Sequence, residues 1–355
     1  MSLHILGNRN KDMKHLLNTL FITTQGSYIA REGETLLIRV EHETKNRFPV
    51  VQLQSVICFG QVSMSPPAMG LCAEHGVTVS FLSEQGKFIA RVVGPVSGNV
   101  LLRKEQYRFS DNLDASTAIA RNMITGKLVN CRNMLMRGAR ERDDVESKAI
   151  LASSAKAFTR HLRALPDSAN LDELRGKEGD ASADYFAVFD HFITVNKEDF
   201  YFRFRSRRPP LDNINAMLSF VYTLLVHDTV SALEGVGLDP AVGFMHRDRP
   251  GRPSLALDLM EELRPVLADR LVIALINRQQ VQGCGFTKTE CGGVIMDNET
   301  RKTVLVAWQE RKQEEITHPF IGEKIKIGLI PHVQALLFAR FLRGDLEAYP
   351  PFFWK

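Results

Sequence analysis

The sequence predicts a two-domain α+β protein, in which a small β-rich N-terminal domain precedes a larger, mainly α-helical catalytic domain. Three observations lead to this prediction. Short runs of β-branched and aromatic residues dominate up to residue 93, and a stretch with glycine and proline follows at residues 94–99. Beyond it, apolar residues recur with the helical period of 3.6. A chain of 355 residues is long enough for two domains that each bury a core.

The first domain begins with predicted strands at residues 17–24, 27–30 and 35–40. Each is a short run rich in residues that favour strands. Gly33 lies between two acidic residues and marks a hairpin turn between the second and third of these runs. The apolar run at residues 50–59 continues the strand pattern.

One helix interrupts the strands. Pro66 and Pro67 begin it and Gly76 ends it, the usual placement of proline first and glycine last. Strands at residues 77–82 and 88–93 then flank a hairpin signal at residues 84–87. We expect a β-rich domain over residues 13–95, used for dimerisation or partner contact, and a linker over residues 96–103. The first twelve residues are interpreted as a polar leader.

The second domain, residues 104–355, is predicted to be helical. Residues 114–165 contain no proline and read as long amphipathic helices, broken near Gly126 or Gly138. A second helix is expected over residues 211–233. Ser254 can cap a third that runs to about Asn277. A short hairpin is expected over residues 294–307, with its turn at residues 297–298.

The net charge of +4 does not by itself indicate a nucleic-acid partner. Basic residues are nevertheless clustered. Six of them lie between residues 121 and 142 against one acid, and four arginines lie among aromatic residues between residues 200 and 210. Such clusters can neutralise DNA phosphates, although a solvated basic helix face is an equally good interpretation of either one alone.

Five cysteines form no C-x-x-C pair, which favours reduced, mostly buried thiols in a cytoplasmic protein over a zinc site. No segment approaches the ~18 uninterrupted apolar residues of a membrane span. The N-terminus lacks the pattern of a signal peptide. We therefore expect a cytoplasmic protein with no membrane partner.

Residues 237–265 contain the strongest functional pattern. His246 lies in a loop rich in proline and glycine, and arginines follow it before a predicted helix that carries Asp258, Glu261 and Glu262. An imidazole with carboxylates can bind a divalent cation, and arginine suits a phosphate-bearing substrate. The alternatives are a histidine packed in the core and acids that stabilise a helix N-terminus. We accept that alternative for Glu262 and interpret it as a surface or salt-bridging acid.

Glu178 lies upstream between Gly176 and Gly179, where a helical pattern resumes. Each glycine inside a helix costs about 1 kcal/mol relative to alanine, so the pair needs a reason. Close approach of another backbone and approach of a substrate are two such reasons. A loose first helical turn is the third.

Several long motifs resemble a known family. They are R-G-K-E-G at residues 175–179, R-x-R-x-x-R-P-P-L-D-N-I-N-A-M-L-S-F-x-Y-T-L-L from residue 203, L-D-P-x-x-G-F-M-H from residue 238, and R-P-S-L-A-L-D-L-M-E-E-L-R-P at residues 252–265. Together they resemble the CRISPR-associated integrase family, the catalytic subunit of the spacer-acquisition complex. The likeness spans nearly the whole chain and is closest to the versions that accompany class 1 interference systems.

The resemblance implies a metal-dependent endonuclease and integrase that joins spacer DNA 3′-hydroxyls to the CRISPR repeat by transesterification. It implies that Glu178, His246 and Glu261 bind Mg²⁺ or Mn²⁺, with Asp258 as an auxiliary acid of the catalytic group and no nucleotide cofactor. Some family members have aspartate at the position of Glu261. We expect six arginines to contact DNA: Arg203, Arg205, Arg207, Arg208, Arg249 and Arg252. Asn215 and Tyr222 look like packing and orienting residues.

The implied partners are double-stranded DNA, a second copy in a homodimer, and a small ferredoxin-like CRISPR-associated subunit. An iron–sulfur nuclease that trims spacer ends is a further partner that the resemblance suggests. Two alternative functions stay open at this point. One is a metal-dependent DNA nuclease without integration, and the other is a DNA-binding scaffold whose acids merely cap helices.

Overall fold

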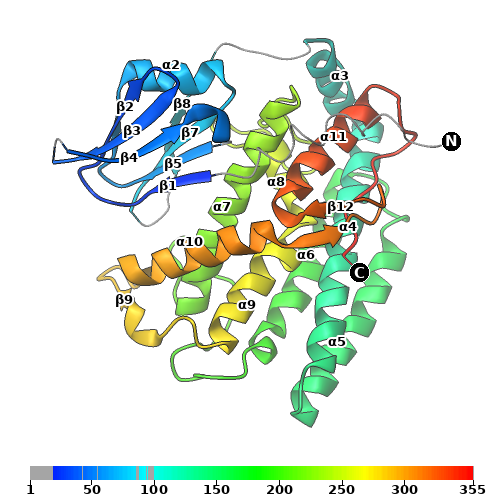
Figure 1. Ribbon diagram of the computed structural model, residues 1–355. Coiled ribbons are helices and arrows are strands. Elements are labelled where there is room, and N and C mark those ends of the chain that lie inside the picture. The colour runs from blue at the N-terminus through cyan, green and yellow to red at the C-terminus, as the bar shows by residue number, and fades with distance from the viewer. Residues whose placement is uncertain are drawn as a thin grey trace. The chain divides into compact units, whose positions relative to one another are not determined.

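The computed structural model describes residues 19–41, 43–53, 55–84, 88–92, 94 and 100–354. The chain divides into two units, residues 1–98 and 99–355, and residues 100–103 of the predicted linker are helical. The predicted leader, the hairpin turn at residues 85–87 and the linker residues 96–99 lie outside the described residues. A β-rich first unit followed by a mainly helical second one confirms the predicted fold class (Figure 1).

The first unit contains two four-stranded sheets. One has the order β1-β5-β7-β8, with strands Thr19–Ile22, Ser55–Phe59, Thr78–Leu82 and Phe88–Val92. Its first three strands are parallel and β8 is antiparallel. The other has the order β4-β3-β2-β6, with strands Glu43–Pro49, Thr35–Val40, Tyr28–Glu32 and Ser63–Met64.

Local sequence accounts for most of this unit. The predicted hairpin at Gly33 is the β2–β3 turn, where φ is 59°. Helix α2 (Pro66–Glu74) is capped by the Ser65 side chain, and Gly76 follows it with φ of 67°. The predicted strand at residues 50–59 is correct only from Ser55, because Val50–Gln52 forms a short 3₁₀ helix. Strand β4 was not predicted, since its polar, mostly exposed residues lack the alternation of a half-buried strand.

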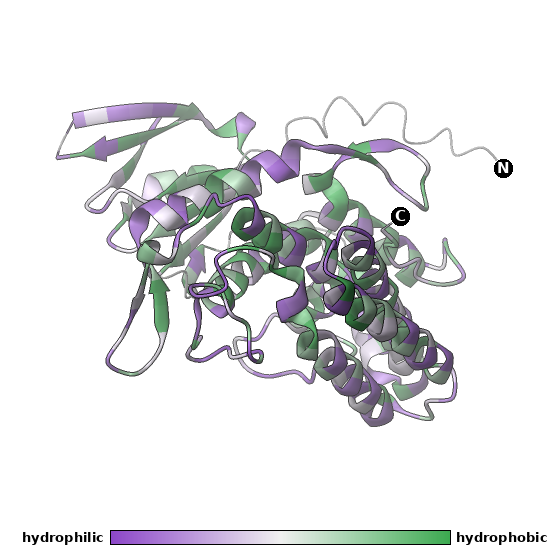
Figure 2. Cartoon of the chain, turned by 90° about the horizontal axis from the view of Figure 1, so that it is seen from below, coloured by the Kyte–Doolittle hydropathy of each residue, from purple (hydrophilic) through white to green (hydrophobic). Residues whose placement is uncertain are grey.

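The second unit begins with α3 (Val100–Asp111) and continues with α4 (Leu113–Arg140), α5 (Val145–Ala164), α6 (Leu171–Ala187) and α7 (Asn213–Gly235). Its later elements are α8 (Ser254–Glu261), the π-helical turn η3 (Arg264–Asp269), α9 (Arg270–Asn277), α10 (Asn298–Gln313) and α11 (Ile330–Leu342). Two small hairpins pair β9 (Phe286–Lys288) with β10 (Val294–Met296) and β11 (Glu315–Thr317) with β12 (Lys324–Lys326). Hydrophilic and hydrophobic residues share these helices, as amphipathic packing requires (Figure 2).

Residues 114–165 form two helices as predicted, and the break between them, at residues 141–144, lies just after Gly138 and not near Gly126. Both glycines permit close packing: a Cβ on Gly126 would lie 2.8 Å from Pro351, and one on Gly138 would overlap Phe192. Two other details of the predicted helical domain are wrong. The hairpin expected at residues 294–307 lies earlier, at β9–β10. Asp297 instead caps α10 by accepting from the Thr300 amide at 2.7 Å.

The second error concerns Ser254, which is the first residue of α8 rather than its cap; Pro253 precedes the helix. The Ser254 hydroxyl donates to the carbonyl of Arg247 instead. The end of this segment at Asn277 is as predicted, although the π-helical turn η3 separates α8 from α9.

Helix α7 forms the centre of the second unit. By length and composition alone it is apolar enough to cross a membrane, but most of it is buried inside the unit. That burial is typical of the core helix of a globular protein.

A buried acid ties η3 to two helices. Asp269, 1 % exposed, accepts hydrogen bonds from Tyr222 of α7 at 2.6 Å and Tyr185 of α6 at 3.1 Å. Burial raises the pKa of this carboxyl to about 6, although both tyrosine hydrogen bonds and nearby arginines oppose the rise. The folded state therefore retains a proton that the unfolded chain releases near pH 3.8.

Stability should consequently fall as the pH rises from about 4 to about 7, and Asp269 should account for roughly 3 kcal/mol of that fall. Asp269→Asn should remove this contribution, because the amide carries no charge and a tyrosine hydroxyl can accept from it. Urea unfolding of both proteins across this range measures the difference. Asp167→Asn, at an exposed position, is the control. Parallel pH profiles for wild type and Asp269→Asn would refute the assignment.

Candidate active site

The loop before α8 is built around Asp258. This carboxylate is fully buried and accepts hydrogen bonds from the backbone amides of Phe244 at 2.6 Å, Met245 at 3.0 Å and His246 at 2.9 Å. Gly243 is required beside it, because a Cβ there would lie 2.7 Å from the Cβ of Ser254 and 2.8 Å from an oxygen of Asp258. The G-F-M-H motif thus wraps its backbone around one carboxylate.

Asp258 also orients the imidazole of His246. Its Oδ1 lies 2.5 Å from Nδ1 of His246, so Nδ1 donates and the Nε2 lone pair is left for another partner. Nε2 points toward Glu261, whose Oε1 is 4.0 Å away. A carboxylate that fixes the tautomer of a histidine is the usual support of a metal-binding imidazole.

Two contacts hold α6 against this loop. Arg175 donates to the carbonyl of Met245 at 2.6 Å, and Arg247 pairs with Asp172 at 3.0 Å. Glu178 lies one turn beyond Arg175 on the same helix, in its middle and not in a loose first turn. Gly176 and Gly179 face open space, so neither makes a close backbone contact. Neither a close backbone contact nor a loose first turn therefore explains this glycine pair.

Glu178 and Glu261 meet at Lys127 of α4. The Lys127 ammonium forms an ion pair with Oε1 of Glu178 and lies 2.8 Å from Oε2 of Glu261, while Ser182 lies 2.9 Å from the same nitrogen. Arg264 binds the other oxygen of Glu261 at 2.8 Å. Burial by itself raises the pKa of Glu261, but Arg264, Lys127 and His246 outweigh it and lower that pKa to about 2. Glu261 is therefore ionised throughout the neutral range.

The chemistry of these side chains suits a divalent cation. Oε2 of Glu261 is buried and accepts no well-oriented hydrogen bond, and Nε2 of His246 has a free lone pair. Lys127, however, lies between the two glutamates. Among the described residues, no group of three histidine, cysteine or acidic side chains is arranged to hold a metal ion. The side chains that could bind a metal ion are therefore close together, but the Lys127 ammonium lies between the two glutamates.

Glu262 is not the surface acid that we expected. It is fully buried, and it accepts hydrogen bonds from the Tyr349 hydroxyl at 2.5 Å, from Gln334 at 2.9 Å and from the Phe352 amide at 3.0 Å. Burial raises its pKa to about 7 against the effect of these hydrogen bonds. Its partners lie about 70 to 90 residues away, so the local sequence holds no signal for this role.

The predicted DNA-contacting arginines fall into two groups. Arg203, Arg207, Arg208 and Arg249 are exposed, and Arg252 is half-buried. Burial lowers the pKa of Arg252, and the positive charges of Arg249 and Arg208 lower it further. Arg205 is held inside the unit. It donates to Asn215 at 2.6 Å and lies over the Tyr222 ring, 5.2 Å from its centroid.

The basic cluster at residues 121–142 is largely structural. Lys127 is in the acidic centre, Arg121 donates to the carbonyl of Ser168, and Arg142 donates to that of His191. A solvated basic helix face, the plainer of the two interpretations of this cluster, therefore does not describe these three residues. Asn215 and Tyr222 have the packing and orienting contacts expected of them.

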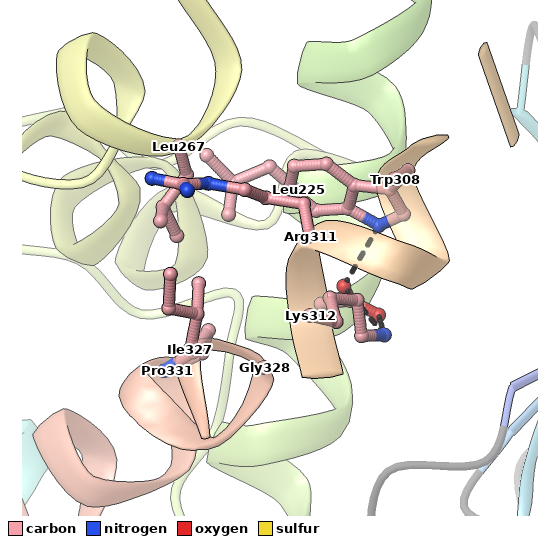
Figure 3. Close-up of a pocket in the computed structure, with 9 residues that line it drawn as sticks. Leu225, Leu267, Trp308, Arg311, Lys312, Ile327, Gly328 and Pro331 are labelled. Carbon is pink, nitrogen blue, oxygen red and sulfur yellow. Dashed lines mark hydrogen bonds and ion pairs between the residues drawn. The ribbon is translucent and has the colours of Figure 1, made fainter. Parts of the chain in front are cut away.

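A separate small pocket lies elsewhere in the helical unit (Figure 3). Leu225 of α7, Leu267 of η3 and Trp308 of α10 line it, and Asp228 accepts hydrogen bonds from Trp308 and Lys312 beside it. It contains none of the predicted site residues. The acidic centre around Lys127 is therefore the stronger candidate for chemistry.

This geometry defines a class of protein: a helical enzyme domain with an oriented imidazole and two carboxylates, near a group of arginines suited to phosphates. The family model of CRISPR associated protein Cas1 matches residues 20–310. The chain therefore belongs to the Cas1 family. Its N-terminal β-rich and C-terminal helical arrangement agrees with that assignment.

Curated relatives match over almost their entire length. A CRISPR-associated endonuclease Cas1 of Chlorobaculum tepidum is 50 % identical over 343 residues, covering 97 % of this chain and 100 % of the relative. One from Rhodospirillum rubrum is 52 % identical over 347 residues, with 97 % and 100 % covered. The solved structure of a Cas1 protein from Thermotoga maritima has the same fold, with a TM-score of 0.81 at 21 % identity and 95 % and 100 % of the two chains covered.

Some relatives carry or bind further proteins. In Geobacter sulfurreducens a relative 33 % identical over 337 residues is a fusion of a Cas4 exonuclease with a Cas1 endonuclease, and the match covers 94 % of this chain and 60 % of the fusion. A solved Cas6-RT-Cas1–Cas2 complex contains the same fold, with a TM-score of 0.81 at 21 % identity over 96 % of this chain and 36 % of the larger one.

Proposed function

We propose that this protein is a metal-dependent DNA integrase and endonuclease of CRISPR adaptation, which joins spacer 3′-hydroxyls to the repeat by transesterification. The observation that carries the proposal is that three separate segments converge at Glu261: Lys127 links Glu261 to Glu178, and Nε2 of His246 lies 4.0 Å from its other oxygen. Helix caps need no such convergence. Membership of a family whose curated relatives are named endonucleases supports the same activity.

Glu178, Nε2 of His246 and Glu261 would hold Mg²⁺ or Mn²⁺, and the imidazole makes the site more tolerant of Mn²⁺ than an all-oxygen site. When bound, the cation supplies Lewis-acid polarisation of the scissile phosphate. Asp258 keeps His246 in the tautomer that presents Nε2. Arg264 fixes one oxygen of Glu261, so the carboxylate has a single orientation.

The reaction needs no nucleotide cofactor. One phosphodiester bond breaks as the spacer 3′-hydroxyl forms another, and the released 3′-oxygen takes the proton that the attacking hydroxyl loses. The exposed arginines Arg203, Arg207, Arg208 and Arg249, together with Arg252, would hold the DNA backbone, which would supply affinity with little sequence information. Arg205 orients this segment from inside, through Asn215 and Tyr222.

Two joining events at the ends of one repeat require two such centres, which favours a homodimer bridged by a partner. The Cas2-containing complex supports a small ferredoxin-like subunit as that bridge, and the Cas4 fusion supports cooperation with a spacer-trimming nuclease. We assign the β-rich unit to dimerisation or partner contact, and the protein to the cytoplasm, where its DNA substrates lie.

Incubation of the protein with a 3′-hydroxyl spacer duplex and a repeat-bearing plasmid tests the proposal. The expected product is spacer covalently joined to the plasmid in the presence of Mg²⁺ or Mn²⁺. A nuclease without integration would yield nicked plasmid and unjoined spacer, and a DNA-binding scaffold would leave the plasmid intact and the spacer unjoined. A 3′-deoxy spacer is the matched control, since it lacks the attacking oxygen.

Arg207→Ala should weaken DNA binding and flatten its salt dependence. Each lost phosphate contact lowers the slope of log affinity against log salt by about 1. Arg205→Ala should mainly destabilise the fold, because its guanidinium has internal partners. Fluorescence anisotropy at several salt concentrations measures the slope, with Arg160→Ala of α5, at an exposed position, as control. An unchanged slope in Arg207→Ala would remove that residue from the interface.

A further inference from the structure

We propose that Lys127 is the resident counter-cation of the metal-free centre, and that its ammonium must leave Glu178 and Glu261 when a divalent cation binds. This inference rests on the proposed metal site. It assigns to Lys127 a role in setting metal affinity and in keeping the centre assembled without metal.

The contacts of Lys127 single it out. Its ammonium pairs with Glu178 from α6 and Glu261 from α8, and its third neighbour is the Ser182 hydroxyl at 2.9 Å. The side chain is 11 % exposed, and those of Glu178 and Glu261 are 17 % and 3 % exposed. One ammonium thus holds together the two glutamates that would bind the metal.

The same oxygens cannot serve both cations fully. Oε2 of Glu261 is buried, and Lys127 is its ion-pair partner, without a well-oriented hydrogen bond. Oε1 of Glu178 has Lys127 and Ser182 as partners. A metal bound to these atoms would lie within a few ångströms of the ammonium, and the repulsion between the two charges would be large at this depth.

Charge balance leads to the same conclusion. Glu178 and Glu261 carry two negative charges, and Lys127 and Arg264 supply two positive ones. Arg264 binds Oε1 of Glu261 and packs over the Tyr222 ring, with 5.0 Å to its centroid, so it is fixed. Lysine is a compact charge on a flexible four-carbon stem. Lys127 is therefore the cation that can move aside.

Calorimetric titration of the purified full-length protein with Mn²⁺ tests the inference. Lys127→Met retains most of the side-chain volume without the charge and should bind Mn²⁺ at least about tenfold more tightly than wild type. Lys127→Arg keeps a competing cation and should show no such gain. Lys177→Met is the matched control, because Lys177 neighbours Glu178 on α6 but donates to Ala164 and Ser168 instead.

Thermal melting gives an independent readout. With chelator present, Lys127→Met should melt several degrees below wild type, since two buried carboxylates lose their partner. Mn²⁺ should then raise its melting temperature more than it raises that of wild type. If Lys127→Met does not fold without metal, recovery of the fold by Mn²⁺ supports the inference, and Lys127→Gln provides the second neutral variant for titration.

The outcomes separate this inference from the proposed function. Folded Lys127→Met or Lys127→Gln with Mn²⁺ affinity equal to or weaker than that of wild type would overturn the inference while leaving the metal site standing. Absence of Mn²⁺ binding in wild type and in both neutral variants would overturn both. Binding by the neutral variants but not by wild type would support the inference strongly.

Discussion

Glu178→Gln is expected to lower the rate of spacer joining by about a thousandfold or more, with DNA affinity within about twofold of wild type. The substitution keeps the size of the side chain and its hydrogen bond with Ser182, but removes the charge that Lys127 now neutralises. His246→Ala should have an equal effect, because it removes the nitrogen that Asp258 orients. DNA affinity should be retained because neither Glu178 nor His246 is among the residues proposed to contact the DNA backbone.

Joining is measured by the integration assay, and binding by anisotropy on the same spacer duplex. Asp180→Asn is the matched control, since it removes an exposed acid two residues from Glu178 on the same helix. Joining at near wild-type rates by both Glu178→Gln and His246→Ala would show that the chemistry occurs elsewhere.

Glu262→Ala is expected to destabilise the helical unit by about 3–5 kcal/mol. It would leave the Tyr349 hydroxyl and the Phe352 backbone amide buried without their acceptor, and the Gln334 amide without one of its three acceptors. The loss should also release the C-terminal segment from α4, because Pro351 and Glu262 both pack on Gly126. Because Glu261 directly precedes Glu262, its position should change too, and the rate of spacer joining should fall as well.

Urea unfolding measures the stability change, and limited proteolysis at the C-terminus measures release of the segment. Glu310→Gln, at an exposed position on α10, is the control. A change in unfolding free energy below about 1 kcal/mol would mean that the buried network contributes little. In that case the tail would be held mainly by its aromatic residues and by Asn130, which donates to the carbonyl of Phe352 at 2.8 Å.

The order of the two units, and most of their larger elements, could be predicted from local patterns. Some signals predict the structure of the residues in which they lie. They are the cap at Ser65 with Gly76 after the helix, the turn at Gly33, and the apolar periodicity of α7. Strand β4 could not be found this way, because it is polar and depends on pairing with β3. The close packing at Gly126 and Gly138 could not be found either, since it involves distant partners.

The candidate site shows the same division. The resemblance of its motifs to a known family indicated Glu178, His246 and Glu261, and their roles as metal ligands remain predictions. Lys127 was grouped with DNA-binding charges because nothing near it in sequence shows that it faces two glutamates. Glu262 was misjudged for the same reason: its acceptor role is defined by Gln334 and Tyr349, far along the chain. Local sequence indicates which side chains are able to take part in chemistry, whereas packing between distant segments determines which of them lie in contact.

The central claim is that Glu178, His246 and Glu261 together hold the divalent cation used for joining. Diffraction from Mn²⁺-soaked crystals, recorded at the manganese absorption edge, tests it most directly. We predict one strong anomalous peak per chain, about 2.0–2.3 Å from both carboxylates and from Nε2 of His246. Protein that is active in Mn²⁺ but shows no such peak, or shows one away from these three side chains, would contradict the claim.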